Sequence, residues 1–239
     1  MSAAELDLLV VGAHPDDAEV HVGGLLALAA RRGLRAGILD LTGGDLGTRG
    51  SAEARRSEAL EAARILGVER TILGLPDARF SEDEATRLAL MAQFRRLRPH
   101  VLVLPAPEDA HPDHRRAFRL GREASYTAGL RNYPCEGEPW RPKAVAWVGG
   151  VNPATAPDLV VDVSEVWEQR MAALDAFGSQ FRPDASQPWT RIADPTFHRG
   201  IEGRAMHWGS LILTDWAEGL WTEKPIQPAL LKLAAALRS

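Results

Sequence analysis

The stretch LDLLVVGAHPDDAEVHVGG, Leu6–Gly24, joins an apolar run to a polar loop. Residues 6–11 are apolar except for one aspartate, which is typical of a strand buried on both faces of a parallel sheet. The run ends abruptly in HPDD at residues 14–17. Because two adjacent carboxylates repel each other and contribute nothing to a hydrophobic core, we expect this loop to belong to a functional site.

Strands and helices alternate through the first half of the chain. Beyond the first strand, hydrophobic periodicity predicts strands at 36–41, 71–73 and 101–104, and helices at 20–32, 51–66, 82–97 and 114–129. Ser51 is a suitable cap for the second of these helices, and Gly67 is a suitable end. This alternation predicts an α/β fold in which helices cover both faces of a mostly parallel sheet.

The second half follows a less regular pattern. It predicts strands at 144–148 and 159–163, a helix at about 165–177 capped by Ser164, an irregular loop at 179–195, a short helix at 202–208 and a final helix at 228–238. No sharp change in composition marks a boundary. We therefore expect a single domain over residues 1–239, with a core at about 5–131 and a C-terminal elaboration at about 132–239.

The composition excludes several classes of protein. The 28 basic and 32 acidic residues give a net charge of −4, which lacks the basic footprint of a nucleic-acid-binding protein. No apolar run is long enough to span a membrane, and the N-terminus lacks the features of a signal peptide. The single cysteine, Cys135, excludes an internal disulfide and a cysteine-rich zinc site. Together these features predict a cytoplasmic protein without nucleic-acid or membrane partners.

Three loops carry polar residues at the points where predicted parallel strands end. The first holds HPDD at 14–17, the second holds Gly43-Gly44-Asp45 and leads to Arg49, and the third holds DAHPDH at 109–114. Ligands bind at the carboxyl ends of the strands in open parallel sheets. We therefore expect the three loops to form one rim around a ligand.

The histidines and carboxylates of this rim suit a metal site. A hydrolytic zinc centre requires three protein ligands and an open position for water. One tight turn can bring His14 and Asp17 to a single point, and His114 would supply the third ligand from the distant loop. The alternative is that HPDD forms only a turn, because Pro and Asp favour turns. Two copies of His-Pro-Asp, each shortly after a buried strand, favour the metal site.

Three further residues would then carry the chemistry. Asp16 would lie beside the metal without binding it, where its carboxylate can act as the general base for water. His111 would donate a proton or a hydrogen bond to the developing oxyanion, and Asp113 would orient His111. The sequence leaves open whether Asp16 or His111 protonates the leaving amine. It also leaves open the metal, because two imidazoles and one carboxylate accept zinc, iron, cobalt or manganese.

The loop after the second predicted strand offers contacts for a substrate. Arg49, Arg55 and Arg56 carry guanidinium groups that can bind hydroxyls or a carboxylate. On this interpretation we expect Asp45, Arg49 and Arg55 to bind the substrate. The alternative is that Arg55 and Arg56 pair with Glu58 on an exposed helix. A phosphate cradle is disfavoured, because the loop lacks the Lys-Ser/Thr end of a P-loop.

Several motifs resemble those of the PIG-L/LmbE family of zinc-dependent de-N-acetylases. They are AHPDDAEVHVGG (13–24), Arg55 and Glu58 followed by AARILG (62–67), LGLPD (73–77) and HPDH (111–114). The stretches DLVVDVSEVWEQRMAALDAFGSQF (158–181) and WAEGL (216–220) are similar to the bacillithiol-biosynthesis branch, the BshB-type deacetylases. The resemblance covers most of the chain.

The resemblance implies a Rossmann-like fold, a small-molecule glucosaminide as substrate, and a homo-oligomer, which in this branch is often a hexamer. It implies these roles: zinc ligands at His14, Asp17 and His114, the base at Asp16, a polarising or acid group at His111, and a contact to substrate hydroxyls or an anionic aglycone at Arg55. In the bacillithiol branch, the reaction would convert N-acetylglucosaminyl malate to glucosaminyl malate and acetate.

Two positions depart from the family pattern. His21 stands where relatives commonly carry a small residue, and Trp216 stands where a tyrosine is often expected. A thiol-conjugate amidase and a chitooligosaccharide deacetylase are therefore alternatives within the family. A binding protein with a structural metal would need four protein ligands. A nucleotide-binding Rossmann protein would need a glycine fingerprint, which the chain lacks.

Overall fold

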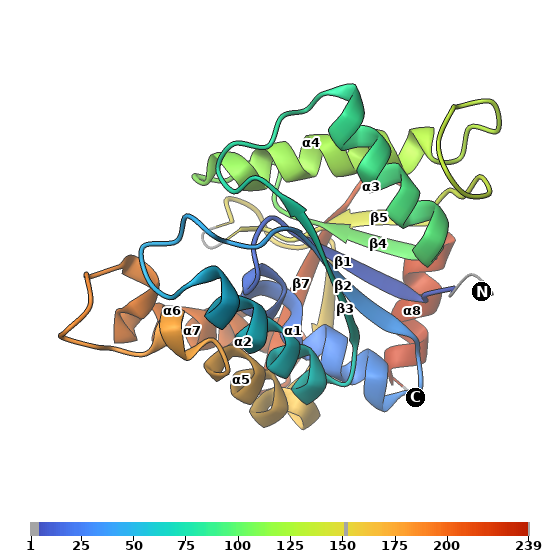
Figure 1. The fold of residues 1–239 in the computed structure, drawn as a ribbon. Helices are drawn as coiled ribbons and strands as arrows, with labels where there is room; N and C mark the ends of the chain where they lie inside the picture. Colours follow the sequence, from blue (N-terminus) through green and yellow to red (C-terminus); the bar gives the residue numbers. More distant parts are fainter. Residues whose placement is uncertain (1–4, 151–152, 239) are drawn as a thin grey trace.

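One mixed sheet forms the centre of the computed structural model, which describes residues 5–150 and 153–238 (Figure 1). Its strands are β1 (Leu8–Gly12), β2 (Ala36–Thr42), β3 (Glu69–Leu75), β4 (Val101–Leu104), β5 (Ala144–Trp147), β6 (Leu159–Asp162) and β7 (Ala217–Thr222). Their order across the sheet is β3-β2-β1-β4-β5-β7-β6. Neighbours from β3 to β5 pair in parallel, whereas β7 runs antiparallel to both β5 and β6.

Helices cover both faces of this sheet. They are α1 (Asp17–Arg31), α2 (Ala52–Leu66), α3 (Glu84–Leu97), α4 (Pro112–Thr127), α5 (Trp167–Asp175), α6 (Gly178–Phe181), α7 (Pro195–Ser210) and α8 (Pro228–Arg238), with the 3₁₀ turns η1 (Ser164–Val166) and η2 (Arg191–Ala193). Figure 1 shows α3 and α4 on one side of the sheet, and α1, α2 and α5 on the other. The predicted α/β fold with a mostly parallel sheet is therefore confirmed.

The central strand β1 explains why both faces are covered. All five of its residues are buried. Leu8 and Val10 belong to the core that includes residues of α1, α2 and α5, whereas Leu9 and Val11 belong to the core that includes residues of α3 and α4. Because side chains alternate between the two faces along a strand, a continuous apolar run is stable only between two layers of helices.

The strand order brings the first and third polar loops together. Strand β1 has β2 on one side and β4 on the other. The connections after β1 and β4 therefore leave the sheet in opposite directions, and such a switch point is where open parallel sheets bind ligands. Residues 14–17 follow β1 at this edge, and residues 109–114 follow β4.

Helix α1, which follows the first polar loop, begins earlier than the sequence predicted. The helix begins at Asp17 rather than at residue 20, and Asp16 at its N-cap has a φ of 114°. Positive φ is costly for a residue with a side chain and persists only where the surroundings enforce it. The backbone N–H of His14 donates to Asp17 Oδ2 at 2.9 Å, which holds the turn closed. The loop carboxylates thereby lie at the positive end of the α1 dipole.

Ser164 does not cap the helix predicted at about 165–177. Its hydroxyl oxygen lies 2.8 Å from Thr214 Oγ1 and accepts a hydrogen bond from the backbone N–H of Trp216 at 3.0 Å. The segment begins as η1, and α5 ends at Asp175. Partners distant in sequence thus occupy a side chain that the local pattern assigned to a helix cap.

Helix α7 is longer than the helix predicted at 202–208. It begins at Pro195, where the Asp194 side chain caps it by accepting from the backbone N–H of Thr196 at 2.8 Å. Gly200 lowers the helix propensity of the first turns and obscured them in the sequence.

Strand β7 has no counterpart among the predicted elements. Glu218 and Gly219 interrupt its apolar pattern, so the strand depends on its pairing with β5 and β6. Through β7, the segment predicted as a C-terminal elaboration at about 132–239 extends the same sheet as the core.

The predicted ends of α2 are confirmed, and they support a stability prediction. Ser51 Oγ accepts from the backbone N–H of Ala54 at 3.1 Å, and Gly67 ends the helix with a φ of 76°. We expect Ser51→Ala to lower the free energy of unfolding by about 1 kcal/mol, because a helix N–H loses its partner. Urea denaturation measures this loss. The control is Ser57→Ala at an exposed interior position of α2, where stability should stay equal or rise; equal losses in both variants would contradict the cap.

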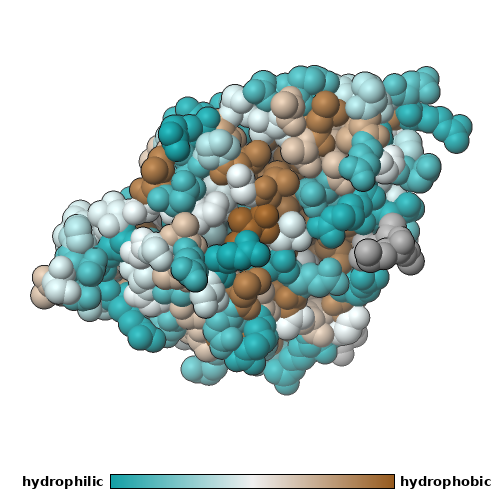
Figure 2. Space-filling model, in the orientation of Figure 1, coloured by the Kyte–Doolittle hydropathy of each residue, from teal (hydrophilic) through white to brown (hydrophobic). Residues whose placement is uncertain are grey.

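Strand β3 forms one edge of the sheet and is only partly covered. Ile72 packs against the core that includes α1 and α2, while Leu73 and Leu75 pack against the opposite core. Figure 2 shows the molecule in the orientation of Figure 1, with apolar residues gathered in the middle of the visible surface and hydrophilic residues around them.

Among the described residues, no helix combines the length and the apolar character needed to cross a membrane.

Candidate metal centre

Three histidines from two loops converge at the carboxyl ends of β1 and β4. The ring centroid of His14 lies 4.7 Å from that of His111 and 5.6 Å from that of His114. The rings of His111 and His114 stack with their centroids 4.8 Å apart. Residues about one hundred positions apart in the sequence therefore share one small volume, as the strand order requires.

Asp17 lies between two of these imidazoles. Its Oδ2 is 3.7 Å from His14 Nδ1, and its Oδ1 is 3.2 Å from His114 Nε2. The structure thus brings together the three residues that the sequence proposed as metal ligands. Two imidazoles and one carboxylate form a donor set that suits zinc and leaves room for water.

His14 and His114 each also have a carboxylate at the ring nitrogen that does not face Asp17. His14 Nε2 lies 3.3 Å from Asp113 Oδ2 and 3.3 Å from Asp77 Oδ1. His114 Nδ1 lies 3.2 Å from Asp109 Oδ2. A carboxylate at the outer nitrogen fixes the tautomer and orientation of a metal-binding histidine and increases its basicity. The inner nitrogens, which face Asp17, are thereby left available to a cation.

Among the described residues, two groups of three side chains place one ligand atom each within 4.8 Å of one another, and neither group includes Asp17. The first group is His14, His111 and His114, and the second is His14, Asp77 and Asp113. The second grouping is explained by hydrogen bonding to His14 Nε2. The first grouping would place the His111 imidazole close to a metal held by His14 and His114.

The electrostatics of the cluster favour a positive charge at its centre. Burial would lower the pKa of His114, but the carboxylates of Asp17 and Asp109 raise it to about 10. Burial also opposes the shift at His14, whose pKa is nevertheless raised by hydrogen bonds to surrounding carboxylates. The pKa of Asp17 is held well below its usual range, against the effect of burial, by His114 and His14. The same field would favour a divalent cation, so the cluster fits a metal.

Asp16 lies beside this cluster in a strained conformation. Its side chain is buried, and its Oδ2 accepts from Arg55 Nη2 at 3.0 Å. Burial raises the pKa of Asp16 to about 7, although the Arg55 guanidinium opposes the shift. A carboxylate with a pKa near neutrality can accept a proton and return it at physiological pH. The burial and the charges around Asp16 are therefore suited to its predicted role as a base.

Arg55 is held in place by the backbone around Asp16. Its Nη2 donates to Pro15 O at 2.6 Å, and its Nη1 donates to Gly44 O at 3.0 Å. Glycine suits position 44, because its φ is 66° and a Cβ there, 2.0 Å from Arg55 Nη1, would displace this guanidinium. The buried guanidinium thus positions Asp16 at the edge of the site.

The other two residues predicted to bind substrate occupy different surroundings. Arg49 is buried, and its guanidinium donates to the carbonyls of Arg182, Asp184 and Pro188 at 2.8 to 3.0 Å. This arrangement ties the loop before η2 to the loop after β2. Asp45 is exposed on the loop after β2.

His111 and Asp113 differ from the arrangement that the sequence proposed. The Asp113 carboxylate contacts His14 rather than His111, whereas its backbone N–H donates to His111 Nδ1 at 3.2 Å. Partial burial lowers the pKa of His111, which favours the neutral ring. In that form Nδ1 is the acceptor and Nε2 carries the proton, so His111 is a hydrogen-bond donor.

Sequence reasoning assigned no role to Asp77 and Asp109. Both side chains contact the outer nitrogens of His14 and His114, Asp77 at His14 and Asp109 at His114. Asp109 opens the third polar loop, and Asp77 ends the LGLPD motif. Their position at the ends of predicted strands was the available signal, but their partners became visible only in the folded chain.

We expect Asp109→Asn to weaken metal binding by roughly 10- to 100-fold, because an amide orients His114 less firmly and lowers its basicity. Titration against a competing chelator measures the affinity. Glu108→Gln is the control, since Glu108 is an exposed acid on the same loop. An equal loss in both variants would mean that general charge, rather than the contact to His114, causes the effect.

Comparison with known proteins points to one family. The family model described as PIG-L, GlcNAc-PI de-N-acetylase, matches residues 9–125. This segment contains the three histidines, Asp16, Asp17 and the carboxylates around them.

Relatives of similar length match most of the chain. A diacetylchitobiose deacetylase from Thermococcus kodakarensis is 30% identical, with 89% of this chain and 81% of the relative covered. A 4-oxalmesaconate hydratase from Pseudomonas putida is 27% identical, with 85% and 83% covered. The crystal structure of a conserved protein from Thermus thermophilus is 40% identical with a TM-score of 0.84, and covers 92% of this chain and 96% of its own.

Proposed function

Since this chain belongs to the PIG-L family of GlcNAc-PI de-N-acetylases, we propose that it is a metal-dependent hydrolase that removes the N-acetyl group from a glucosaminide. The observation that carries this proposal is the position of Asp17 between His14 and His114, with the spare carboxylate of Asp16 nearby. The second candidate ligand set, with three histidines, would leave the same carboxylate in place.

His14, Asp17 and His114 would hold the metal, and we propose zinc because this donor set suits it. When bound, the metal would supply a Lewis acid that polarises the acetamide carbonyl and lowers the pKa of a coordinated water. The carboxylates of Asp77, Asp109 and Asp113 support this site by holding the two imidazoles.

The remaining chemistry falls to side chains around the metal. Asp16 would take a proton from the attacking water as the bond to the acetamide carbon forms. His111 would donate a hydrogen bond to the oxyanion of the tetrahedral intermediate, a contribution of roughly 3–4 kcal/mol for one well-placed donor. The leaving amine would receive its proton from Asp16 or from His111. Arg55 would keep the Asp16 carboxylate aimed at the site.

We propose N-acetylglucosaminyl malate as the substrate, because the segments 158–181 and 216–220 resemble the bacillithiol branch. A chitooligosaccharide is the alternative within the same chemistry, and the relative from Thermococcus kodakarensis supports it. We further propose that the protein works as a homo-oligomer in the cytoplasm, and that Asp45, Arg49 and Arg55 contribute to the binding of substrate directly or through the loops that they hold.

Acetate release tests the function. The purified protein, loaded with zinc, is incubated with N-acetylglucosaminyl malate, N,N'-diacetylchitobiose and 4-oxalmesaconate. We expect acetate from at least one glucosaminide and no change in 4-oxalmesaconate. Hydration of 4-oxalmesaconate without acetate release from any glucosaminide would overturn the proposal and favour the chemistry named for the relative from Pseudomonas putida.

A further inference from the structure

Helix α1 is broken at Val22, five residues after the proposed metal ligand Asp17. The φ and ψ of Val22 are −143° and 28°, outside the helical range, although the helix continues on both sides of it. Sharp breaks in helices occur at proline, at pairs of glycines, or where a side chain enters the backbone hydrogen-bond ladder. The sequence HVGG at residues 21–24 has no proline but has two glycines, which permit a break without enforcing one.

Side chains occupy one step of the α1 hydrogen-bond ladder at this break. In a continuous helix the backbone N–H of Gly24 would donate to the carbonyl of Val20. Here the N–H groups of Gly24 and Leu25 donate to the two carboxylate oxygens of Glu218 at 2.9 and 2.7 Å. The Val20 carbonyl accepts from Arg170 Nη2 at 3.0 Å. A carboxylate thus caps the second part of α1, and a guanidinium caps the first part.

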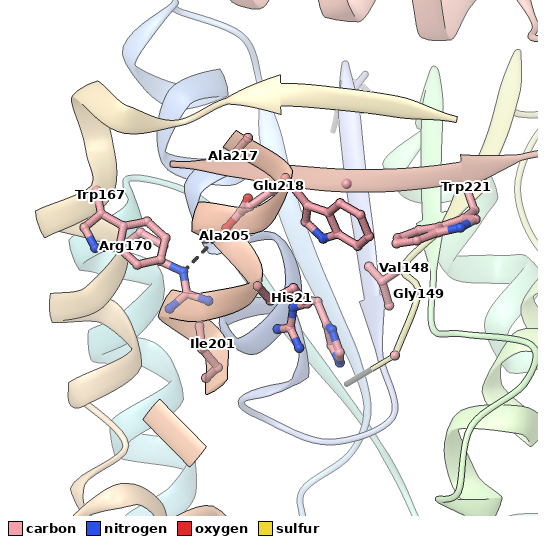
Figure 3. Close-up of a pocket in the computed structure, with 14 residues that line it drawn as sticks. His21, Val148, Gly149, Trp167, Arg170, Ile201, Ala205, Ala217, Glu218 and Trp221 are labelled. Atoms are coloured by element: carbon pink, nitrogen blue, oxygen red, sulfur yellow. Dashed lines mark hydrogen bonds and ion pairs between the residues drawn. The ribbon is translucent and has the colours of Figure 1, made fainter. Parts of the chain in front are cut away.

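Arg170 and Glu218 form a buried ion pair across the break. Arg170 Nε lies 3.4 Å from Glu218 Oε1, and both residues are at most 5% exposed. Figure 3 shows the two side chains facing each other in the lining of a small hollow between α1, α5, α7 and β7. A buried ion pair is weak evidence for stability, because desolvation offsets the attraction between the charges. The contacts of this pair to the α1 backbone indicate instead that it fixes one conformation of the helix.

Three elements of the C-terminal half meet at the break. Arg170 lies on α5, Glu218 lies on β7, and Arg204, which donates to the same carbonyl as Arg170 at 3.0 Å, lies on α7. Gly24 permits this close packing, because a Cβ there would lie 2.8 Å from Val163 Cβ. The side chains that hold the break therefore come from outside the segment that carries the candidate metal ligands.

The short turn before the break is also held from the side of the sheet. Glu19 accepts from Nη1 of Arg70, a residue of β3, at 2.6 Å. Arg70 Nε in turn donates to Asp40 of β2 at 2.6 Å, and all three side chains are fully buried. This contact ties the turn to the sheet, whereas the ion pair at the break sets the tilt of the turn relative to the rest of α1.

The tilt of this turn determines where Asp17 lies. Five residues at a rise of about 1.5 Å each place Asp17 roughly 7.5 Å from the break, so a change of about 20° would move it by about 2.5 Å. Metal–ligand distances tolerate only about 0.2 Å. Asp17 has to lie between His14 and His114 to complete the donor set. A small change at the break would therefore exceed what the candidate metal centre accepts.

We propose that Glu218 is a positioning residue for the candidate metal centre. Together with Arg170 it keeps α1 broken at Val22, and the break directs Asp17 towards the metal. The proposal rests on the proposed function, because it takes Asp17 as a metal ligand. The C-terminal half of the chain thereby acts on a metal centre whose proposed ligands all lie in the first half.

Cobalt binding tests the proposal, because Co²⁺ suits two imidazoles and one carboxylate and its visible absorption depends on the geometry of its ligands. The measured quantities are the affinity for Co²⁺, against a competing chelator, and the spectrum of the bound ion. Glu218→Gln keeps the side-chain shape but offers one oxygen where the carboxylate offers two. We expect it to weaken Co²⁺ binding by roughly 10- to 100-fold and to change the spectrum. Glu223→Gln, the same change at an exposed position directly after β7, should alter neither quantity.

A double variant separates positioning from stability. Arg170→Met combined with Glu218→Met removes both charges of the pair, a change that buried ion pairs often tolerate, and lets the α1 ladder close. We expect this variant to fold and yet to bind Co²⁺ at least tenfold more weakly than the wild-type protein, with a changed spectrum. It keeps the proposal testable where Glu218→Gln does not fold.

Wild-type affinity and a wild-type spectrum in either folded variant would overturn the inference. A weaker affinity with an unchanged spectrum would overturn it as well, because the ligand geometry would then be intact. Both results would leave the deacetylase function standing, since that function is tested by acetate release. A wild-type protein that binds neither Co²⁺ nor Zn²⁺ would instead overturn the metal centre and the proposed function with it.

Discussion

Asp16→Asn is expected to reduce kcat for acetate release by roughly two to four orders of magnitude while the protein keeps its full metal content. The amide cannot accept a proton from water. It preserves the side-chain shape, and asparagine tolerates the φ of 114° at this position better than most residues. The oxygen of the amide can still accept from Arg55, so the loop should keep its conformation.

Acetate release and metal analysis on the same preparation measure the two halves of this prediction. Asp215→Asn is the control, because it makes the same chemical change at an exposed position and should leave kcat unaltered. If Asp16→Asn retained more than about a tenth of the wild-type kcat with its metal bound, Asp16 would not be the base. A loss of metal together with activity would instead make Asp16 a ligand.

His14→Ala is expected to lose both the metal and the activity. The variant removes one of the proposed donors, so its affinity should fall by more than the roughly 10- to 100-fold that loss of an outer carboxylate costs. The change also leaves Asp77 and Asp113 facing a space without their common imidazole partner. The metal content after dialysis should drop from about one ion per chain to less than a tenth of that value.

The control for this variant is His100→Ala. His100 precedes β4 at the opposite, amino-terminal edge of the sheet, where its ring stacks on Trp140. The His100→Ala variant should keep its metal and its activity. Treatment of the wild-type protein with a chelator should abolish activity, and added zinc should restore it. Full metal binding by His14→Ala would exclude this histidine as a ligand and leave the proposed centre without its first loop.

Local sequence patterns predicted much of this architecture. The apolar run at residues 6–11 predicted a strand covered on both faces, and all residues of β1 are buried. Ser51 and Gly67 marked the ends of α2, since a cap and a left-handed end depend on a few neighbouring residues. The two His-Pro-Asp copies marked the loops that carry the candidate metal ligands. These features are local because hydrogen bonding and side-chain alternation act over one or two turns.

Other features depend on which distant segments meet. Asp113 and Asp77 contact the outer nitrogen of His14 because the loops after β4 and β3 meet the loop after β1 at the same end of the sheet. Strand β7 has a weak pattern of its own and exists through pairing with β5 and β6. Arg170, Arg204 and Glu218 look like ordinary surface charges in the sequence, yet they line one hollow. Burial turns such charges into partners, because a charge removed from water needs another charge or a polar group to compensate it.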